Sequence, residues 1–196
     1  MIELILDTSH IGLNIGILKH NVLIEKVEIE ASRKQSELTM PLLEELFTKN
    51  EINPQNIQKV IITEGPGSFT GLRIAMTIAK VLCSMLECDL YTINTLVAYV
   101  NPKIEKGLAI MDARGKRAYV AKFEKGKLVS SPTTIPLQEI DIEGYQIFGD
   151  AHLLNLSSEK FSIIDNIIDY RDQWKKVDDI DALVPLYLKD NKEYGN

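Results

Sequence analysis

Three consecutive segments near the N-terminus have the residue pattern of β-strands, and no helical pattern separates them. Residues Ile2–Leu6 form a continuous apolar run, which is typical of a buried central strand. The segments Ile11–Leu18 and Val22–Ile29 alternate, and the pair His20-Asn21 between them suits a tight turn. The sequence therefore predicts that the fold begins with an antiparallel meander of three strands.

Helices and strands alternate in the rest of the first hundred residues. The elements expected next are a helix over Ser36–Lys49, a strand over Val60–Ile62, a helix over Thr70–Leu86 and a strand over Leu90–Ile93. Ser36 is the expected N-cap of the first helix, because a serine side chain can accept a hydrogen bond from the first turn. The predicted order is β-β-β-α-β-α-β.

The same order begins again after Asn101-Pro102, with shorter helices. The expected elements are strands over Leu108–Met111, Ala118–Phe123, Leu128–Val129 and Tyr145–Phe148, with short helices at Pro136–Ile140 and after Gly149. Residues 178–188 are expected to form a closing helix and an extended tail. We therefore predict two lobes, residues 1–101 and 102–196, with the C-terminal segment free to pack back on the first lobe.

Two copies of this order are the arrangement of the actin-like ATPase superfamily, which has a ribonuclease H-like fold. The predicted fold class is therefore a duplicated actin-like α/β fold whose second lobe has shortened helices. In such a fold, the hairpin after the first strand of each lobe holds phosphate. Here these hairpins begin at Asp7-Thr8-Ser9 and at Asp112. Asp, Thr and Ser are equally common in turns that bind nothing, so both interpretations stay open.

Composition restricts the class of partner. A formal charge of -6 disfavours direct binding to a nucleic acid, because such binding depends on Lys and Arg neutralising phosphates. Four residues separate Cys83 from Cys88 and no second Cys/His pair follows, so we expect two small apolar residues in a reducing compartment. The N-terminus lacks a basic leader, and we expect no membrane-spanning segment and a cytoplasmic location.

The glycine-rich stretch from Gly65 to Gly71 lies between a predicted strand and a predicted helix. A P-loop requires Lys and then Ser or Thr after its last glycine, but Leu72 and Arg73 follow here. The dinucleotide fingerprint also fails, because Thr70 occupies the position of its third glycine. We expect a sharp turn, with Ser68 or Thr70 capping the helix.

The helix after this turn is apolar over more than one face. Its polar residues Arg73, Thr77, Lys80 and Ser84 form one narrow stripe, and Gly71, Ala75 and Ala79 form a stripe of small residues beside Leu72, Met76 and Cys83. Covering one sheet requires an apolar arc of only about 100°. Either a partner helix packs on the second side, where small residues allow close approach, or the first helix of the same lobe covers it.

Four segments of the chain resemble the TsaB family, also called YeaZ. They are MIELILDTS, GPGSFTGLRIAMTIAK, MDARGKRAYVAKF and LVPLYLKDN. Members of this family are bacterial accessory proteins for the threonylcarbamoyl modification of adenosine 37 in tRNAs that read ANN codons. The resemblance implies an actin-like, non-catalytic subunit that binds the transferase TsaD, joined by the ATPase TsaE. It also implies a homodimer in isolation, and the acidic net charge leads us to expect that tRNA is contacted only indirectly, through a partner.

The resemblance further implies that the two helices of the first lobe form the partner interface. The residues expected there are Ser36, Met40, Leu42, Leu43, Leu46, Gly71, Leu72, Ala75, Met76, Ala79 and Cys83. No catalytic residue and no metal ligand is expected. Where the catalytic paralogue has the two histidines that hold its metal, this chain has Thr95 and Tyr99, which bind divalent cations poorly.

This sequence departs from the family pattern at two places. Gln35 replaces a histidine that is frequent in the family, and Gly149-Asp150-Ala151-His152 replaces a glycine-rich turn where an adenosine would rest. We therefore expect no cofactor in the isolated chain, and ATP or ADP only at an interface with a partner.

Three alternatives remain open. One is a small actin-like ATPase or kinase that uses Asp7 and Asp112 with magnesium. Another is a glycoprotease-like homodimer without activity, since no residue has a recognisable nucleophile context. The third is a homodimeric structural protein that ignores TsaD.

Overall fold

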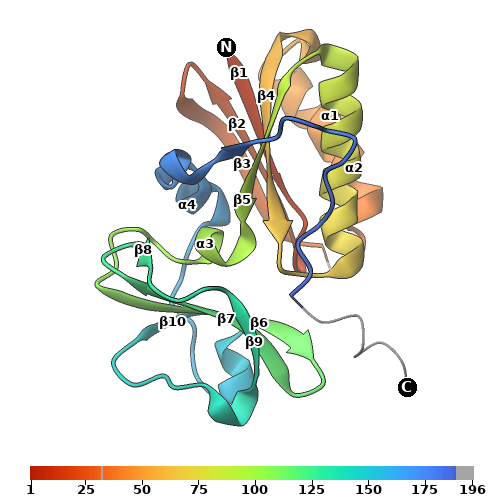
Figure 1. Ribbon diagram of the computed structural model, residues 1–196. Helices are drawn as coiled ribbons and strands as arrows, with labels where there is room; N and C mark the ends of the chain where they lie inside the picture. Colours follow the sequence, from red (N-terminus) through yellow and green to blue (C-terminus); the bar gives the residue numbers. More distant parts are fainter. Residues whose placement is uncertain (32, 189–196) are drawn as a thin grey trace. The chain divides into compact units, whose positions relative to one another are not determined.

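The chain folds into two compact units. The computed structural model describes residues 1–31 and 33–188 (Figure 1). Of the described residues, the first unit comprises 1–64, 68–93 and 172–185 except residue 32, and the second comprises 65–67, 94–171 and 186–188. The predicted division at a single point between residues 101 and 102 differs from this arrangement, because the chain re-enters the first unit after residue 171.

The first unit contains a six-stranded sheet. Its strands are β1 (Ile2–Asp7), β2 (Gly12–Lys19), β3 (Val22–Glu30), β4 (Ile57–Gly65), β5 (Asp89–Asn94) and β11 (Lys175–Lys176). Their order across the sheet is β11-β5-β4-β1-β2-β3. The predicted meander is confirmed, since β1 pairs antiparallel with β2 and β2 with β3, while β4 lies parallel to β1.

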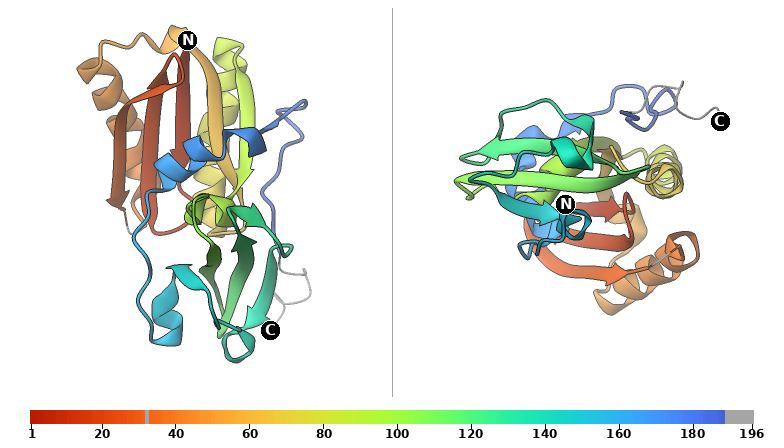
Figure 2. Two further views of the ribbon diagram at one scale, coloured as in Figure 1. Left: turned by 90° about the vertical axis from the view of Figure 1, so that its left-hand side faces the viewer. Right: turned by 90° about the horizontal axis from the view of Figure 1, so that it is seen from below.

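Two long helices pack on one face of this sheet (Figures 1 and 2). They are α1 (Gln35–Lys49) and α2 (Phe69–Leu86). The core between sheet and helices is aliphatic: Leu4, Ile15 and Ile62 from the strands meet Leu43 and Ala79 from the helices. Alternate residues of each strand point to this core, as the period of two requires.

The second unit contains a smaller sheet. Its strands are β6 (Lys106–Arg114), β7 (Arg117–Glu124), β8 (Lys127–Leu128), β9 (Thr133–Pro136) and β10 (Gln146–Gly149). Both β8 and β9 pair with β7, and β10 lies parallel to β6. The unit thus repeats the predicted strand order, but its third strand is split into two pieces.

The helices of the second unit are short, as predicted. Only 3₁₀ turns occur at Leu137–Glu139 and Ala151–Leu154. The short helices α3 (Thr95–Tyr99) and α4 (Ile163–Asp169) are joined by a hydrogen bond from Asn166 Nδ2 to the Ala98 carbonyl at 2.9 Å.

Two local predictions are wrong. The described residues from 178 to 188 contain no helix; instead the preceding strand β11 pairs antiparallel with β5, and Val177 N donates to Leu90 O at 2.9 Å. Ser36 is not an N-cap either, because the helix already begins at Gln35. The side-chain amide of Gln35 donates a hydrogen bond to the His10 carbonyl at 2.9 Å.

The start of α2 lies directly against the end of β1. A Cβ atom added at Gly71 would lie 2.0 Å from the Thr8 carbonyl oxygen, which is far inside van der Waals contact. Only glycine therefore allows the helix to approach the strand this closely, and the glycine-rich turn serves packing at this position.

We predict that Gly71→Ala destabilises the protein. The added methyl group must push α2 away from β1, and overpacking of this kind costs about 1–3 kcal/mol. Urea denaturation of the purified chain measures the change in the free energy of unfolding. The matched control is Ser84→Ala on the exposed side of the same helix, expected to stay within about 0.5 kcal/mol. Equal stability of Gly71→Ala and the wild type would contradict the packing role.

Candidate functional site

The carboxylate of Asp7 is buried in the first unit and accepts hydrogen bonds from three neighbouring residues. Its side chain is 0% exposed and accepts hydrogen bonds from Asn14 Nδ2 at 2.8 Å and Thr63 Oγ1 at 2.5 Å. The Ser9 amide adds a third bond at 3.1 Å, which closes an Asx turn. These contacts give Asp7 a structural role at the junction of three strands.

Thr8 and Ser9 connect β1 to α2. The Thr8 hydroxyl donates to the Gly71 carbonyl at 2.7 Å and accepts from the Ala75 amide at 3.2 Å. The Ser9 carbonyl accepts from the Ser68 amide at 2.7 Å. Ser68 caps α2 by accepting from the Gly71 amide at 3.2 Å, so one of the two predicted caps is confirmed. These contacts neither support nor contradict phosphate binding by Asp7, Thr8 and Ser9, which stays a prediction.

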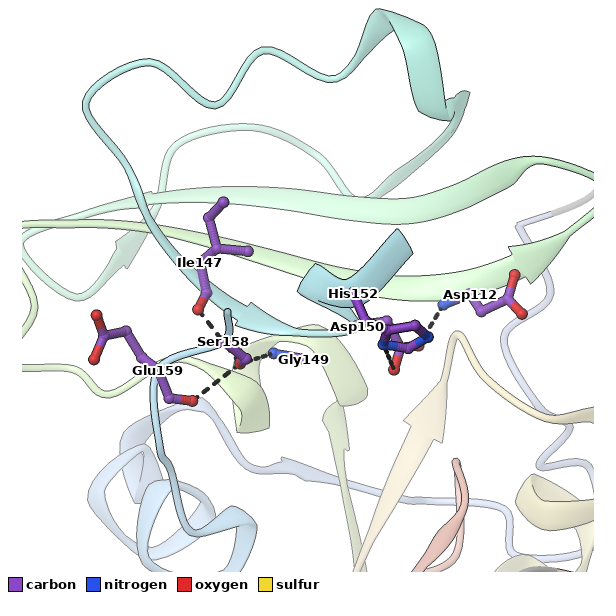
Figure 3. A network of polar contacts seen from close by, with 7 residues as sticks. All are labelled: Asp112, Ile147, Gly149, Asp150, His152, Ser158 and Glu159. Carbon is purple, nitrogen blue, oxygen red and sulfur yellow. Dashed lines mark hydrogen bonds and ion pairs between the residues drawn. The ribbon is translucent and has the colours of Figure 1, made fainter. Parts of the chain in front are cut away.

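Asp112 belongs to a polar network in the second unit (Figure 3). Its exposed carboxylate accepts from the Arg114 amide at 2.7 Å, and its own amide donates to Asp150 Oδ2 at 2.7 Å. His152 Nδ1 lies 4.0 Å from the other Asp150 oxygen. Asp150 therefore ties the end of β6 to the turn after β10, where the family resemblance would place an adenosine.

The other half of the network fixes the same turn from the opposite side. Ser158 Oγ accepts from the Gly149 amide at 3.0 Å and lies 3.4 Å from the Ile147 carbonyl and 3.0 Å from that of Glu159 (Figure 3). A Cβ atom at Gly149 would lie 2.2 Å from the Ile110 carbonyl oxygen. The residues that depart from the family turn thus make internal contacts.

The short helix α3 contributes to the core of the second unit. Thr95 is 0% and Tyr99 is 3% exposed. Thr95 Oγ1 accepts from the Gly65 amide at 3.1 Å, and the Tyr99 ring packs on Phe161 with centroids 4.9 Å apart. Among residues 1–31 and 33–188, no group of three His, Cys, Asp or Glu side chains is arranged to hold a metal ion.

The structure places the expected interface residues of α2 in the core. Gly71 is buried, and Leu72, Ala75, Met76, Ala79 and Cys83 are between 0% and 4% exposed. They pack against the unit's own sheet. A role for these residues in an interface stays a prediction, and within the unit Gly71 lets α2 approach the end of β1.

A different stripe of α2 faces solvent, and we call it the outer apolar stripe. It consists of Ile74, Ile78, Val81 and Met85. Val81 is 52% and Met85 is 75% exposed, while Ile74 and Ile78 are partly buried. The spacing of four, three and four residues places them on one face of the helix. The helical spacing of these four residues is present in the sequence. It could not be recognised there as a separate stripe, because the opposite side of the helix is apolar too.

The expected interface residues of α1 divide between core and surface. Leu43 and Leu46 are buried, and Leu42 is partly buried against the same core. Met40 is 52% exposed and Ser36 is exposed, so these two remain accessible to a partner.

The two cysteines close the C-terminal end of α2. The Cys88 amide donates to the Cys83 carbonyl at 3.2 Å, Glu87 between them is left-handed with φ 52°, and the sulfur atoms lie 3.3 Å apart. This is a Schellman motif whose apolar contact is made by two thiols. Burial raises the pKa of both thiols, so they stay protonated, as expected for small apolar residues.

By length and composition α2 is apolar enough to cross a membrane, contrary to the expectation that no segment would be. Core helices of soluble proteins pass the same test, and α2 has one face in the core between sheet and helices. The length of the apolar run therefore reflects a helix that is apolar on its buried face and on part of its exposed face.

Comparison with known proteins decides the family. Residues 21–167 match the family model of TsaD, tRNA N6-adenosine threonylcarbamoyltransferase. An uncharacterized protein of Mycoplasma genitalium is 31% identical over 96% of this chain and 95% of its own length. The tRNA threonylcarbamoyladenosine biosynthesis protein TsaB of Bacillus subtilis is 30% identical over 63% of this chain and 56% of its own length. The chain belongs to the TsaB (YeaZ) family.

Solved structures of the TsaB family confirm the predicted fold. YeaZ from Pseudomonas aeruginosa superposes with a TM-score of 0.78 at 17% identity, covering 95% of this chain and 99% of that one. A second Pseudomonas aeruginosa structure, described as similar to peptidase YeaZ, gives a TM-score of 0.81 at 18% identity, covering 96% and 99%. The duplicated actin-like architecture is therefore shared over almost the whole chain.

We predict that Thr8→Val lowers stability without changing nucleotide binding. The substitution keeps the side-chain shape but removes the hydroxyl that joins β1 to α2, and buried polar groups that lose a partner cost about 1–3 kcal/mol. Urea denaturation measures the loss, and Thr70→Val at the exposed start of α2 is the control. Unchanged stability together with altered ATP affinity of the isolated chain would show that Thr8 serves a phosphate instead.

Proposed function

We propose that this TsaB-family chain is a non-catalytic subunit that binds and activates a TsaD-type transferase. The reaction is the N6-threonylcarbamoylation of adenosine 37 in tRNAs that read ANN codons, and a TsaE-type ATPase joins the assembly. The names of the relatives support the pathway, because the Bacillus subtilis and Buchnera aphidicola proteins are named for tRNA threonylcarbamoyladenosine biosynthesis.

The outer apolar stripe is the single observation that carries the binding role. Val81 and Met85 expose large apolar side chains on a helix whose opposite face already packs on the sheet. Contiguous exposed apolar surface of this kind is typical of protein–protein interfaces. Met40 of α1 adds a further exposed apolar side chain to the same unit. The occupant we propose is the corresponding helix face of a TsaD-type partner, replaced in the isolated chain by a second copy.

The lack of a metal-binding pair supports the non-catalytic role. Thr95 and Tyr99 occupy the positions of the metal ligands in the transferase, and both are buried in the core of the second unit with contacts of their own. Neither side chain is a good ligand for a divalent cation. Activity then depends on the partner, and ATP or ADP binds only where the two proteins meet.

We predict that Val81→Asp combined with Met85→Asp prevents partner binding while the chain stays folded. Two carboxylates in the outer apolar stripe would lose their water on association, and a loss at such central positions reaches about 2 kcal/mol, or roughly 30-fold in Kd. Size-exclusion chromatography with light scattering, on mixtures with TsaD from the same organism, measures complex formation. The wild type is expected to co-elute 1:1 with TsaD and to lose its homodimer peak.

The matched control is Thr77→Asp combined with Ser84→Asp. These substitutions add the same charge to the exposed polar side of α2 and should leave the complex intact. Separate peaks for the wild type and folded TsaD would refute the proposed function. Tight binding of ATP to the isolated chain would then favour an actin-like kinase.

A further inference from the structure

The β6–β7 ribbon is strongly basic within an acidic chain. Residues 106–127 contain seven Lys and Arg residues against two Asp and Glu residues, a formal charge of +5, while the whole chain carries -6. The segment forms two antiparallel strands joined by a hairpin at Gly115 and Lys116 (Figure 1). Charge of this density on one ribbon is a local feature that the net charge conceals.

Several of these cations are engaged inside the second unit. Lys106 and Lys122 both lie over the ring of Tyr145, with Nζ 5.8 and 4.8 Å from its centroid. Lys122 also contacts Asp141 at 2.9 Å, which lowers the pKa of that carboxyl. Lys125 lies 3.9 Å from Glu105. These three cations have interaction partners within the second unit.

The hairpin tip is different. Arg114 and Lys116 are exposed, and neither side chain forms a hydrogen bond or an ion pair with the described part of the chain. Arg114 lies directly opposite Arg117 in the register of the two strands, and like charges in this position are unfavourable without a counterion. Arg117 itself donates to the Thr134 carbonyl at 3.0 Å.

The backbone of the tip presents these charges in an open setting. Arg114, Gly115 and Lys116 have φ values of 63°, 61° and 58°, and a Cβ atom at Gly115 would meet nothing within 4 Å. One carboxylate oxygen of Asp112 accepts a hydrogen bond from the Arg114 amide, which stabilises the turn. The tip is thus a fixed, sterically unobstructed pair of cations.

We propose that the Arg114–Arg117 hairpin tip contacts the phosphate backbone of the tRNA. This proposal rests on the proposed function and differs from the expectation that tRNA is reached only through a partner. Arg and Lys side chains that lack an internal counterion are the groups that neutralise nucleic-acid phosphates. An extended backbone fits the tip better than a free nucleotide, because small ligands require concave sites and the cavity in this unit is lined by other residues, including Lys103, Phe148 and Lys160.

The experiment is a tRNA-binding titration on the complex with TsaD. Fluorescence anisotropy with unmodified labelled tRNA gives Kd at several salt concentrations for the wild type and for Arg114→Glu combined with Lys116→Glu. We expect Kd to rise about tenfold near 0.1 M salt, and the slope of log K against log salt to fall by about 1 for each lost phosphate contact. Arg114→Gln combined with Lys116→Gln, which adds no negative charge, should lie between the two.

Lys125→Glu combined with Lys127→Glu is the matched control, because it reverses two charges at the opposite end of β7 and should leave Kd unchanged. Equal effects of both charge reversals, or none from either, would overturn the proposal. A loss of ADP affinity in the Arg114→Glu, Lys116→Glu variant, measured on the isolated chain, would assign the tip to a nucleotide and also overturn it. Failure of the wild type to bind TsaD would refute the proposed function instead, and the same comparison on the isolated chain would then decide the tRNA contact.

Discussion

The contact between the end of β1 and the start of α2 determines most of the first unit. The Thr8 hydroxyl lies between the Gly71 carbonyl and the Ala75 amide, and the absent side chain of Gly71 lets the helix touch the strand backbone. Since β1 is a central strand, this contact fixes α2 over the middle of the sheet. At the same end of β1, the buried Asp7 carboxylate accepts hydrogen bonds from Asn14 on β2 and Thr63 on β4.

The position of α2 explains why one helix is apolar both in the core and on part of its exposed face. The face with small and apolar residues packs in the core against the sheet, and the outer apolar stripe lies on the other side of the helix, where Val81 and Met85 are exposed. In an actin-like enzyme the strand end beside this helix would hold phosphate. Here the Thr8 hydroxyl at this strand end contacts the helix backbone.

The sequence was sufficient for the fold but not for the surface. Period-two alternation predicted the meander, and the restart after Pro102 predicted the second sheet. The C-terminal strand β11 was missed because two residues are too few to show periodicity, and their pairing with β5 depends on tertiary contacts. The sequence alone did not show what the small-residue stripe of α2 packs on, because glycine and alanine are equally suited to close packing on a sheet or on a helix. Only the burial of Ala79, at 0%, distinguishes the two.

Methyl NMR of the isotopically labelled chain, titrated with unlabelled TsaD, tests the central claim most directly. It compares the two methionines of α2, which lie on opposite faces: Met85 is 75% and Met76 is 4% exposed. If the outer face of α2 binds TsaD, the methyl signals of Met85 and Val81 will shift strongly or broaden at a 1:1 ratio, and the methyl signal of Met76 will change little. Equal perturbation of both methionines, or an unperturbed Met85 in a mixture that forms the complex, would contradict it.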